Sequence, residues 1–260
     1  MLLKPKICVY STFYGVPAFS KKSISNHLAY CNKHCYDYKP FLYDKPTHRQ
    51  FSWEKIYLGL RLLKTNHWDA IFWMDGDSWF LDIDFPLHVW LDDHQPIQFT
   101  GDENDIFNGG HFFLKNQSSA LEWLEHCWQF CYINDPKIST THKDLVHLYD
   151  QPGIIISLGG GNPNKLSSWA PAFNRLNGFP GNPYRIHTNF QEVYAPLTLS
   201  KCDAAMSLIC NKWRNKCLIR PQSAMNSYPW NLEGNDFIIH FVGGTHHLMS
   251  EWSDRFEFYI

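Results

Sequence analysis

Short apolar runs alternate with helical patterns along the first third of the chain, and this alternation constrains the fold more than any other feature. Residues 22–34 and 51–63 carry apolar side chains at helical spacing, and β-favouring apolar runs lie around them. Expected strands cover residues 6–11, 38–43 and 70–74. Strands that alternate with helices favour a mainly parallel sheet with right-handed crossovers, in which ligands bind beyond the carboxyl ends of the strands. We therefore predict an α/β fold, with a Rossmann-like central sheet flanked by helices, and expect functional residues just after residue 74.

The rest of the chain continues this pattern less regularly. Ile97–Thr100 and Gly110–Leu114 are typical of strands, and Ser118–Tyr132 is typical of a covering helix. Residues 159–183 contain Gly-Gly-Gly-Asn-Pro-Asn-Lys and Asn-Gly-Phe-Pro-Gly-Asn-Pro, which predict a loop near the active face. No internal repeat, low-complexity tract or charge block marks a linker, so residues 1–260 are predicted to form one domain.

The composition excludes a disordered chain and argues against nucleic acid as a partner. Hydrophobic residues make up 44% of the sequence, and the formal net charge of −2 provides no basic surface for phosphate neutralisation. The closest pairs among the eight cysteines, Cys31/Cys35 and Cys127/Cys131, lack Cys-x-x-Cys spacing, which predicts reduced, mostly buried thiols.

The sequence shows no sign of a membrane-spanning segment or a cleavable signal peptide. No apolar run approaches the ~20 residues of a membrane span, and the N-terminal residues enter a strand directly. We expect a soluble, cytoplasmic chain without a membrane span, and leave open whether it is a domain of a longer protein. The glycosylation sequon at Asn116 is attributed to chance.

Two carboxylates follow the third expected strand. The apolar run Ile71–Met74 leads directly into Asp75-Gly76-Asp77. A tight turn at the glycine allows both aspartates to face a single oxygen-preferring cation, and Mg²⁺ or Mn²⁺ bound by few protein ligands keeps positions open for diphosphate oxygens. The alternative is a solvated turn or a helix cap, but the position after a buried strand favours a metal site.

A second apolar strand near the C-terminus ends at His240, followed by Gly243 and Gly244. Imidazole together with carboxylates suits Mn²⁺, and glycines allow backbone N–H groups to approach phosphate. A strand-end histidine is more often a hydrogen-bonded core residue. Its pairing with the Asp-x-Asp motif favours Asp75, Asp77 and His240 as a metal-binding set.

Seven sequence blocks, in the same order along the chain, resemble glycosyltransferase family 34. The blocks are Asn26-His-Leu-Ala-Tyr-Cys with Tyr36-Asp-Tyr, Trp53-Glu-Lys55 with Leu60-Arg61, Trp73-Met-Asp75-Gly-Asp77, Phe107-Asn108-Gly-Gly110-His-Phe-Phe-Leu-Lys-Asn116, Asp150-Gln151, Asn226-Ser-Tyr-Pro and Asp236-Phe-Ile-Ile-His240-Phe-Val-Gly243. The chain departs from the family at Gly76 and at Gly244, where a cysteine is common, and we expect no N-terminal anchor of the kind that Golgi members carry. This resemblance implies a GT-A fold and retaining, Mn²⁺-dependent transfer from a nucleotide sugar.

The resemblance also implies roles for particular residues. Residues 1–115 would form the nucleotide-binding half and residues 116–260 the acceptor side. Asp150 and Gln151 would lie under the anomeric carbon as catalytic residues, and the donor would contact Thr12, Tyr14, Lys55, Asp75, Asn108, Gly109, Gly243 and Gly244. The simpler alternatives are a hairpin turn at Asn108, a helix cap at Asp150 and a solvated helical side chain at Lys55.

The function that the patterns and the resemblance favour together is transfer of a hexose or pentose, from a UDP-sugar as the resemblance implies, to a hydroxyl of an oligosaccharide or glycoprotein glycan. The resemblance makes galactose the first choice of donor sugar and xylose the second. A glycoside hydrolase is an alternative because paired carboxylates also cleave sugars. A non-catalytic carbohydrate-binding module is another, because 11 tryptophans and 13 tyrosines offer rings that stack on sugars.

Overall fold

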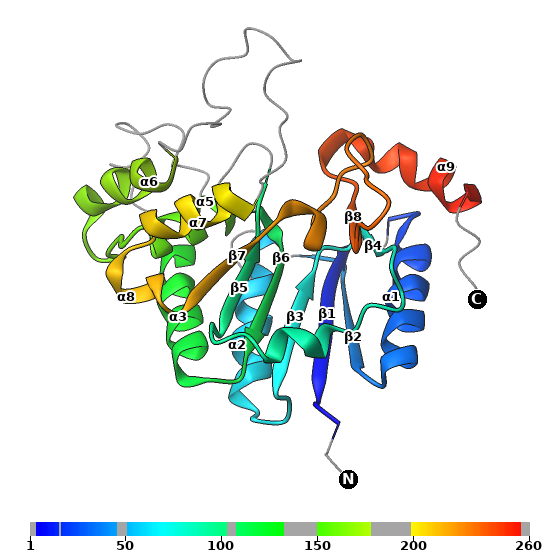
Figure 1. The fold of residues 1–260 in the computed structure, drawn as a ribbon, viewed down its shortest axis with the longest axis horizontal. Coiled ribbons are helices and arrows are strands. Elements are labelled where there is room, and N and C mark those ends of the chain that lie inside the picture. The colour runs from blue at the N-terminus through cyan, green and yellow to red at the C-terminus, as the bar shows by residue number, and fades with distance from the viewer. Residues whose placement is uncertain are drawn as a thin grey trace, which may run out of the picture.

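A mixed six-stranded sheet forms the centre of the computed structural model, which describes residues 4–15, 17–45, 51–102, 108–132, 150–177 and 199–255 (Figure 1). The strands lie in the order β2-β1-β3-β6-β5-β7. Strand β6 is antiparallel to both of its neighbours, whereas the other strands share one direction. This architecture confirms the predicted α/β fold with a mainly parallel sheet. The strand bounds are β1 Ile7–Tyr14, β2 Asp37–Tyr43, β3 Ala70–Met74, β5 Ile97–Thr100, β6 Asn108–Lys115 and β7 Cys217–Arg220.

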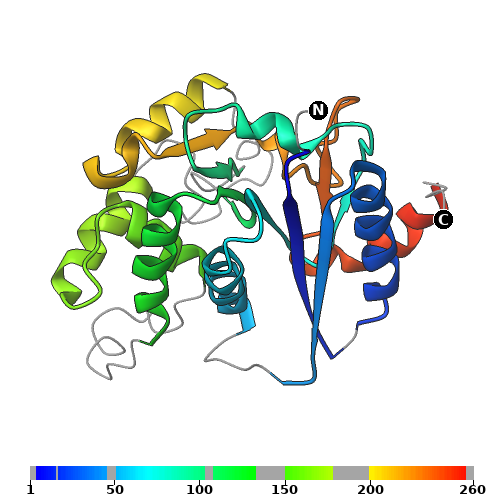
Figure 2. The same ribbon diagram turned by 90° about the horizontal axis from the view of Figure 1, so that it is seen from below.

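Helices cover both faces of this sheet, and Figure 2 shows α1 and α2 on opposite sides of β1. Side chains alternate between the faces, as the strand repeat requires. Tyr10 and Trp73 pack in one core cluster with residues of α2 and α3, whereas Val9 and Phe72 pack in a second cluster with Tyr30 of α1. The helix bounds are α1 Ser20–His34, α2 Glu54–Lys64, α3 Ser118–Trp128, α5 Asp150–Leu158, α6 Trp169–Asn177, α7 Leu199–Leu208, α8 Asn211–Arg214 and α9 Leu248–Arg255.

The prediction of a loop over residues 159–183 is wrong where α6 lies. Trp169, Ala172 and Leu176 are buried at helical spacing in the first cluster, and this apolar face stabilises the helix. Pro171 is tolerated because it lies in the first turn, where its missing N–H would have no helical partner. Residues 178–183 of this prediction lie outside the described part of the chain, as does Phe107.

A small antiparallel pair, β4 (Ser78–Phe80) and β8 (Ile238–His240), lies beside the main sheet. Its register places Ser78 opposite His240. Since β4 starts directly after the Asp-x-Asp motif, this pairing brings the late histidine to the early aspartates.

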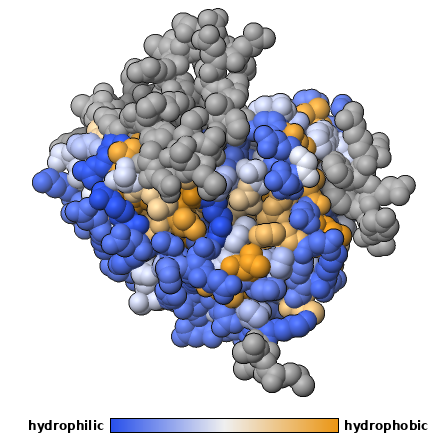
Figure 3. Space-filling model, viewed as in Figure 1, coloured by the Kyte–Doolittle hydropathy of each residue, from blue (hydrophilic) through white to orange (hydrophobic). Residues whose placement is uncertain are grey.

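Among the coloured residues on the face seen in Figure 3, most are hydrophilic, with apolar patches between them. Within the described residues, no helix has the length and apolar character needed to cross a membrane. Most cysteines are buried, as predicted, with Cys35 exposed and Cys210 partly exposed.

Candidate active site

The Asp75-Gly76-Asp77 turn connects β3 to β4 at the carboxyl end of β3. The Asp75 N–H donates to the Gly110 carbonyl at 2.9 Å, and the Ser78 N–H donates back to the Asp75 carbonyl at 3.2 Å. A Cβ atom at Gly76 would lie 2.8 Å from the Phe13 ring and 2.9 Å from the Thr12 carbonyl oxygen. Glycine is therefore required for the turn to pack against the end of β1.

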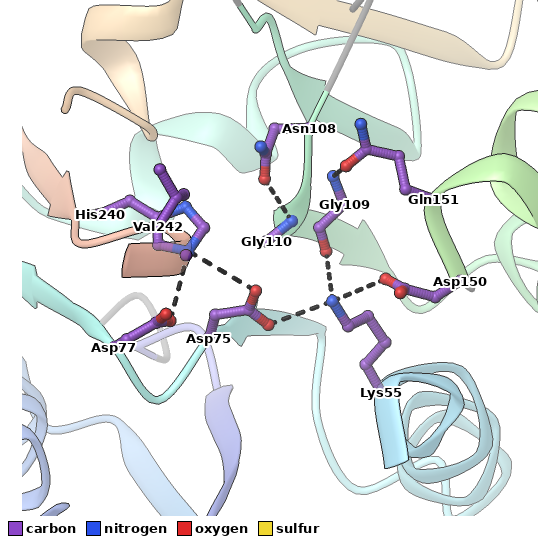
Figure 4. A pocket seen from close by; sticks show the side chains of 11 residues that line it. Lys55, Asp75, Asp77, Asn108, Gly109, Gly110, Asp150, Gln151, His240 and Val242 are labelled. Atoms are coloured by element: carbon purple, nitrogen blue, oxygen red, sulfur yellow. Dashed lines mark hydrogen bonds and ion pairs between the residues drawn. The ribbon is translucent and has the colours of Figure 1, made fainter. Parts of the chain in front are cut away.

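The side chains of Asp75, Asp77 and His240 point toward one another (Figure 4). His240 Nε2 lies 3.3 Å from Asp77 Oδ1 and 3.7 Å from Asp75 Oδ2, and one ligand atom from each residue lies within 4.8 Å of the others. Two carboxylate oxygens and an imidazole nitrogen form a donor set suited to Mn²⁺ or Mg²⁺. The predicted triad thus has the geometry and chemistry of a divalent-cation site.

The charges of this triad are mutually stabilised. Burial alone would raise the pKa of Asp77, but His240 and His246 hold it well below its usual range. Burial would lower the pKa of His240, but Asp77 and Asp75 raise it above the ordinary value. His246, from the turn before α9, places Nε2 2.8 Å from Asp77 Oδ2, and this hydrogen bond raises the pKa of the exposed imidazole. The sequence reasoning missed His246, although it lies six residues after His240.

His111 of β6 lies behind the triad. Its ring packs edge-on against His240, with centroids 4.9 Å apart, and is fully buried. Burial and the neighbouring His240 hold the pKa of His111 well below its usual range. His111 is therefore neutral and leaves the charge of the site to the triad.

Lys55 of α2 is a buried ammonium between two carboxylates. Its Nζ lies 3.1 Å from Asp75 Oδ1 and 2.8 Å from Asp150 Oδ2, and donates to the Gly109 carbonyl at 2.9 Å. Burial would lower the pKa of Lys55, but Asp150 and Asp75 raise it well above its usual value. Burial raises the pKa of Asp75, and Lys55 opposes this effect. Lys55 is therefore not the solvated helical side chain that was one of the two expectations, because its ammonium is paired with Asp75 and Asp150.

Strand β6 and helix α5 line the opposite side of the site. Asn108 starts β6, and its Oδ1 accepts the Gly110 N–H at 2.6 Å. The Gly109 N–H donates to Gln151 Oε1 at 3.1 Å, next to Asp150 at the start of α5. A Cβ atom at Gly109 would lie 3.0 Å from Asp150 Oδ2. Strand β6 and helix α5 thus approach each other closely at Gly109.

A hollow of about 240 Å³ joins these groups. Its lining consists of Lys55, Asp75, Asp77, Asn108, Gly109, Gly110, Asp150, Gln151, His240, Val242 and Gly243. Most residues predicted for catalysis and donor binding therefore meet in one pocket. Gly110 and Val242 were not predicted.

Three candidates for donor binding do not belong to the lining. Thr12 lies at the end of β1 behind Gly76, and Tyr14 stacks on Tyr43 with ring centroids 5.6 Å apart. Gly244 lies in the turn that begins at Gly243. Their proposed contacts with a nucleotide stay predictions.

Comparison with solved structures identifies the fold as the GT-A type. A crystal structure of a glycosyltransferase involved in the glycosylation of the major capsid of PBCV-1 aligns with 96% of this chain and 100% of its own, at 12% sequence identity and a TM-score of 0.55. At this identity the likeness shows the fold alone.

Two other glycosyltransferase structures are less similar. GlyE of Streptococcus pneumoniae TIGR4 aligns with 96% of this chain and 60% of its own, at 11% identity and a TM-score of 0.45. The catalytic domain of Drosophila beta1,4galactosyltransferase 7, in complex with xylobiose, aligns with 48% of this chain and 52% of its own, at 12% identity and a TM-score of 0.32. These TM-scores carry no argument about the present chain. No protein-family model and no curated protein matches the sequence, so membership of glycosyltransferase family 34 is not confirmed.

Proposed function

We propose that this protein is a metal-dependent glycosyltransferase that uses a nucleotide-sugar diphosphate as its donor. The observation that carries the proposal is the convergence of Asp75, Asp77 and His240 at the carboxyl end of β3, in a pocket of a GT-A fold. Within an α/β sheet, the carboxyl ends of strands are where ligands bind. The donor set leaves coordination positions open, as a cation that also binds diphosphate requires.

The roles proposed for the residues follow from their positions. Asp75, Asp77 and His240 hold Mn²⁺ or Mg²⁺, which when bound stabilises the negative charge of the departing nucleoside diphosphate. Gly243, which has a φ of 57° and lines the pocket, exposes backbone near the expected diphosphate.

The sugar would lie between the cation and α5. There the Asp150 carboxylate, positioned by Lys55, faces the donor sugar and stabilises positive charge at the anomeric carbon. Gln151 and Asn108 orient the backbone of β6 against the sugar. We further propose retention of configuration, a UDP-sugar donor with galactose as first choice and xylose as second, and a glycan hydroxyl as acceptor, all from the family resemblance.

A glycoside hydrolase is the second candidate, because Lys55 brings two carboxylates close together. With Nζ 3.1 Å from Asp75 and 2.8 Å from Asp150, these carboxylates are no more than about 6 Å apart, near the separation in retaining glycosidases. However, the Asp75 carboxylate also faces Asp77 and His240, and a set of ligand atoms that converges on one point is better placed to share a cation than to flank a scissile bond. The arrangement therefore favours transfer over hydrolysis.

A carbohydrate-binding module has less support. Trp53, Trp73, Trp79, Trp123, Trp169 and Trp213 are among the largest fully buried side chains. Because these rings form the core, they offer no surface for stacking on sugars.

The test is thermal stability with a panel of UDP- and GDP-sugars, with and without Mn²⁺, because a ligand that binds only the folded state raises Tm. We expect a rise that needs both the metal and one UDP-sugar, followed by transfer to a glycan acceptor. Asp77→Asn should abolish the rise. Asp84→Asn, which removes an exposed carboxylate paired with Lys33, should behave as wild type.

Four other outcomes would contradict the proposal. No rise with any donor in a folded sample, or a wild-type response of Asp77→Asn, would exclude the metal-donor site. Strong glycan cleavage in EDTA would favour the hydrolase. Glycan binding without metal or nucleotide would support the binding module.

A further inference from the structure

A chain of buried hydrogen bonds leads away from the metal-facing histidine. His240 Nδ1 lies 2.7 Å from Asn226 Oδ1, and Asn226 Nδ2 donates to Tyr228 Oη at 3.2 Å. Tyr228 Oη then donates to Asp102 Oδ1 at 2.7 Å. All four side chains are at most 7% exposed. The chain thus connects a proposed metal ligand to a carboxylate outside the pocket lining.

The direction of these hydrogen bonds is fixed by chemistry at the Asp102 end. An ionised carboxylate only accepts, so Tyr228 must use its single hydroxyl proton on Asp102. Asn108 Nδ2 donates to both Asp102 Oδ2, at 2.9 Å, and Tyr228 Oη, at 3.2 Å. Tyr228 can therefore only accept from Asn226, and this requires the NH₂ group of Asn226 to face the tyrosine.

The orientation of Asn226 decides the state of the histidine. With its NH₂ group toward Tyr228, the amide presents its oxygen to His240 Nδ1, and an oxygen without a proton can only accept. Nδ1 must therefore carry the proton of the neutral ring. Nε2 keeps its lone pair, and it is the nitrogen that faces Asp75 and Asp77.

We propose that Asn226, Tyr228 and Asp102 are positioning residues that fix His240 as the Nδ1–H tautomer, so that Nε2 is ready to bind a cation. The significance for metal binding rests on the proposed function, but the tautomer itself does not. Without the amide oxygen, the metal-free site would favour the opposite tautomer, because Nε2–H could donate to Asp77. A cation would then have to displace that proton. Hydrogen bonds of this kind to the second ring nitrogen of a metal-bound histidine orient the ring and are worth about 10–100-fold in metal affinity.

The test is ¹⁵N NMR of the imidazole rings in metal-free protein, at a pH above the raised pKa of His240 as measured by titrating the signals of this ring. Long-range ¹H–¹⁵N couplings distinguish the two tautomers, and His240→Gln assigns the signals. We expect Nδ1–H in the wild type, Nε2–H in Asn226→Leu, and a mixture in Tyr228→Phe. Asn226→Asp keeps an acceptor oxygen beside Nδ1 and should keep the wild-type tautomer.

Mn²⁺ binding to the same proteins, measured by titration calorimetry without nucleotide, gives the second readout. Asn226→Leu should bind about 10–100-fold more weakly than wild type, and Asn226→Asp within a few-fold of it. Tyr36→Phe is the matched control, because Tyr36 Oη makes a similar bond to His88 Nδ1, at 2.9 Å, in another part of the fold. It should change neither the tautomer of His240 nor the affinity.

The outcomes separate this proposal from the proposed function. A wild-type His240 in the Nε2–H form, or an Asn226→Leu protein that keeps Nδ1–H, overturns the hydrogen-bond chain regardless of metal binding. A wild-type protein with Nδ1–H that binds no divalent cation leaves the chain established and refutes the metal site. If Asn226→Leu does not fold, the tautomer of His240 in Tyr228→Phe becomes the test. A single Nδ1–H tautomer in that variant, unchanged from the wild type, refutes the proposal.

Discussion

Replacing Lys55 with methionine would leave the Asp75 and Asp150 carboxylates without the ammonium that they share. The Lys55 side chain is 6% exposed, and its partners Asp75 and Asp150 are 27% and 10% exposed. Breaking a buried ion pair by removing one partner costs about 3–5 kcal/mol. Because Asp75 is partly solvated, we expect a loss near the lower end, about 3 kcal/mol of unfolding free energy at neutral pH.

Lys64→Met provides a matched control on the same helix. Lys64 pairs with Glu125 at 2.9 Å, a similar distance, but the two side chains are 52% and 48% exposed. Solvent-exposed pairs contribute about 0–1 kcal/mol. Urea denaturation of the metal-free proteins, with the midpoint and slope compared, measures both losses. A Lys55→Met protein that loses no more than Lys64→Met would refute the claim that Lys55 is required for charge balance.

The loss should also depend on pH in a predictable direction. Burial raises the pKa of Asp75, and Lys55 opposes that rise, so the pKa increases further in Lys55→Met. A group with a raised pKa favours the folded state below its unfolded pKa, and this contribution is lost as the pH rises through the folded pKa. The deficit of Lys55→Met should therefore be greatest at pH 7 and shrink toward pH 4. A deficit that grows on acidification would contradict the assignment.

Three further predictions use other features of the site and core. Gly110→Ala should weaken Mn²⁺ binding, measured by calorimetry, by about 10-fold or more, because the new Cβ atom would lie 2.5 Å from His240 Cε1. The control Gly234→Ala should bind as wild type, because its Cβ atom would have no neighbour within 4 Å. Burial would lower the pKa of His240, but Asp77 and Asp75 raise it above the ordinary value. Because a cation binds the neutral ring, the affinity for Mn²⁺ should increase as the pH rises through that raised pKa. An affinity that stays constant from about pH 6 to 9 would exclude His240 as a ligand. Gly153→Ala should lower the free energy of unfolding, measured by urea denaturation, by about 1–3 kcal/mol, because the new Cβ atom would lie 2.3 Å from the buried Trp53 ring. A gain in stability would show that the Trp53 side chain can move to accommodate the methyl group.

The local part of this architecture was predictable from the sequence. Strand β3 is apolar at every position and buried throughout, so its bounds agree with the expected residues 70–74. The Asp-x-Asp turn follows because a buried strand must end in a polar segment. The sequence also predicted that His240 lies beside this turn, because it ends a second apolar run, and the structure places its Nε2 3.3 Å from Asp77 Oδ1.

What the sequence did not reveal depends on contacts between distant segments. A lysine on a helix is usually solvated, and nothing local shows that Lys55 lies between Asp75 and Asp150. Likewise, α6 follows a glycine-rich stretch, and its helical state depends on burying Trp169 and Leu176 against the rest of the core. In both cases tertiary packing overrides the local preference.

The pairing of β4 with β8 makes the metal site sensitive to strand register. Backbone hydrogen bonds from Phe241 N–H to the Asp77 carbonyl, 2.9 Å, and from His240 N–H to the Ser227 carbonyl, 2.8 Å, hold β8 in place on both sides. Because side chains alternate along a strand, a slip of one residue would turn the imidazole away and present Ile239 or Phe241 in its place. Insertions and deletions between Ser227 and β8 are therefore compatible with metal binding only when the loop absorbs them without moving the strand.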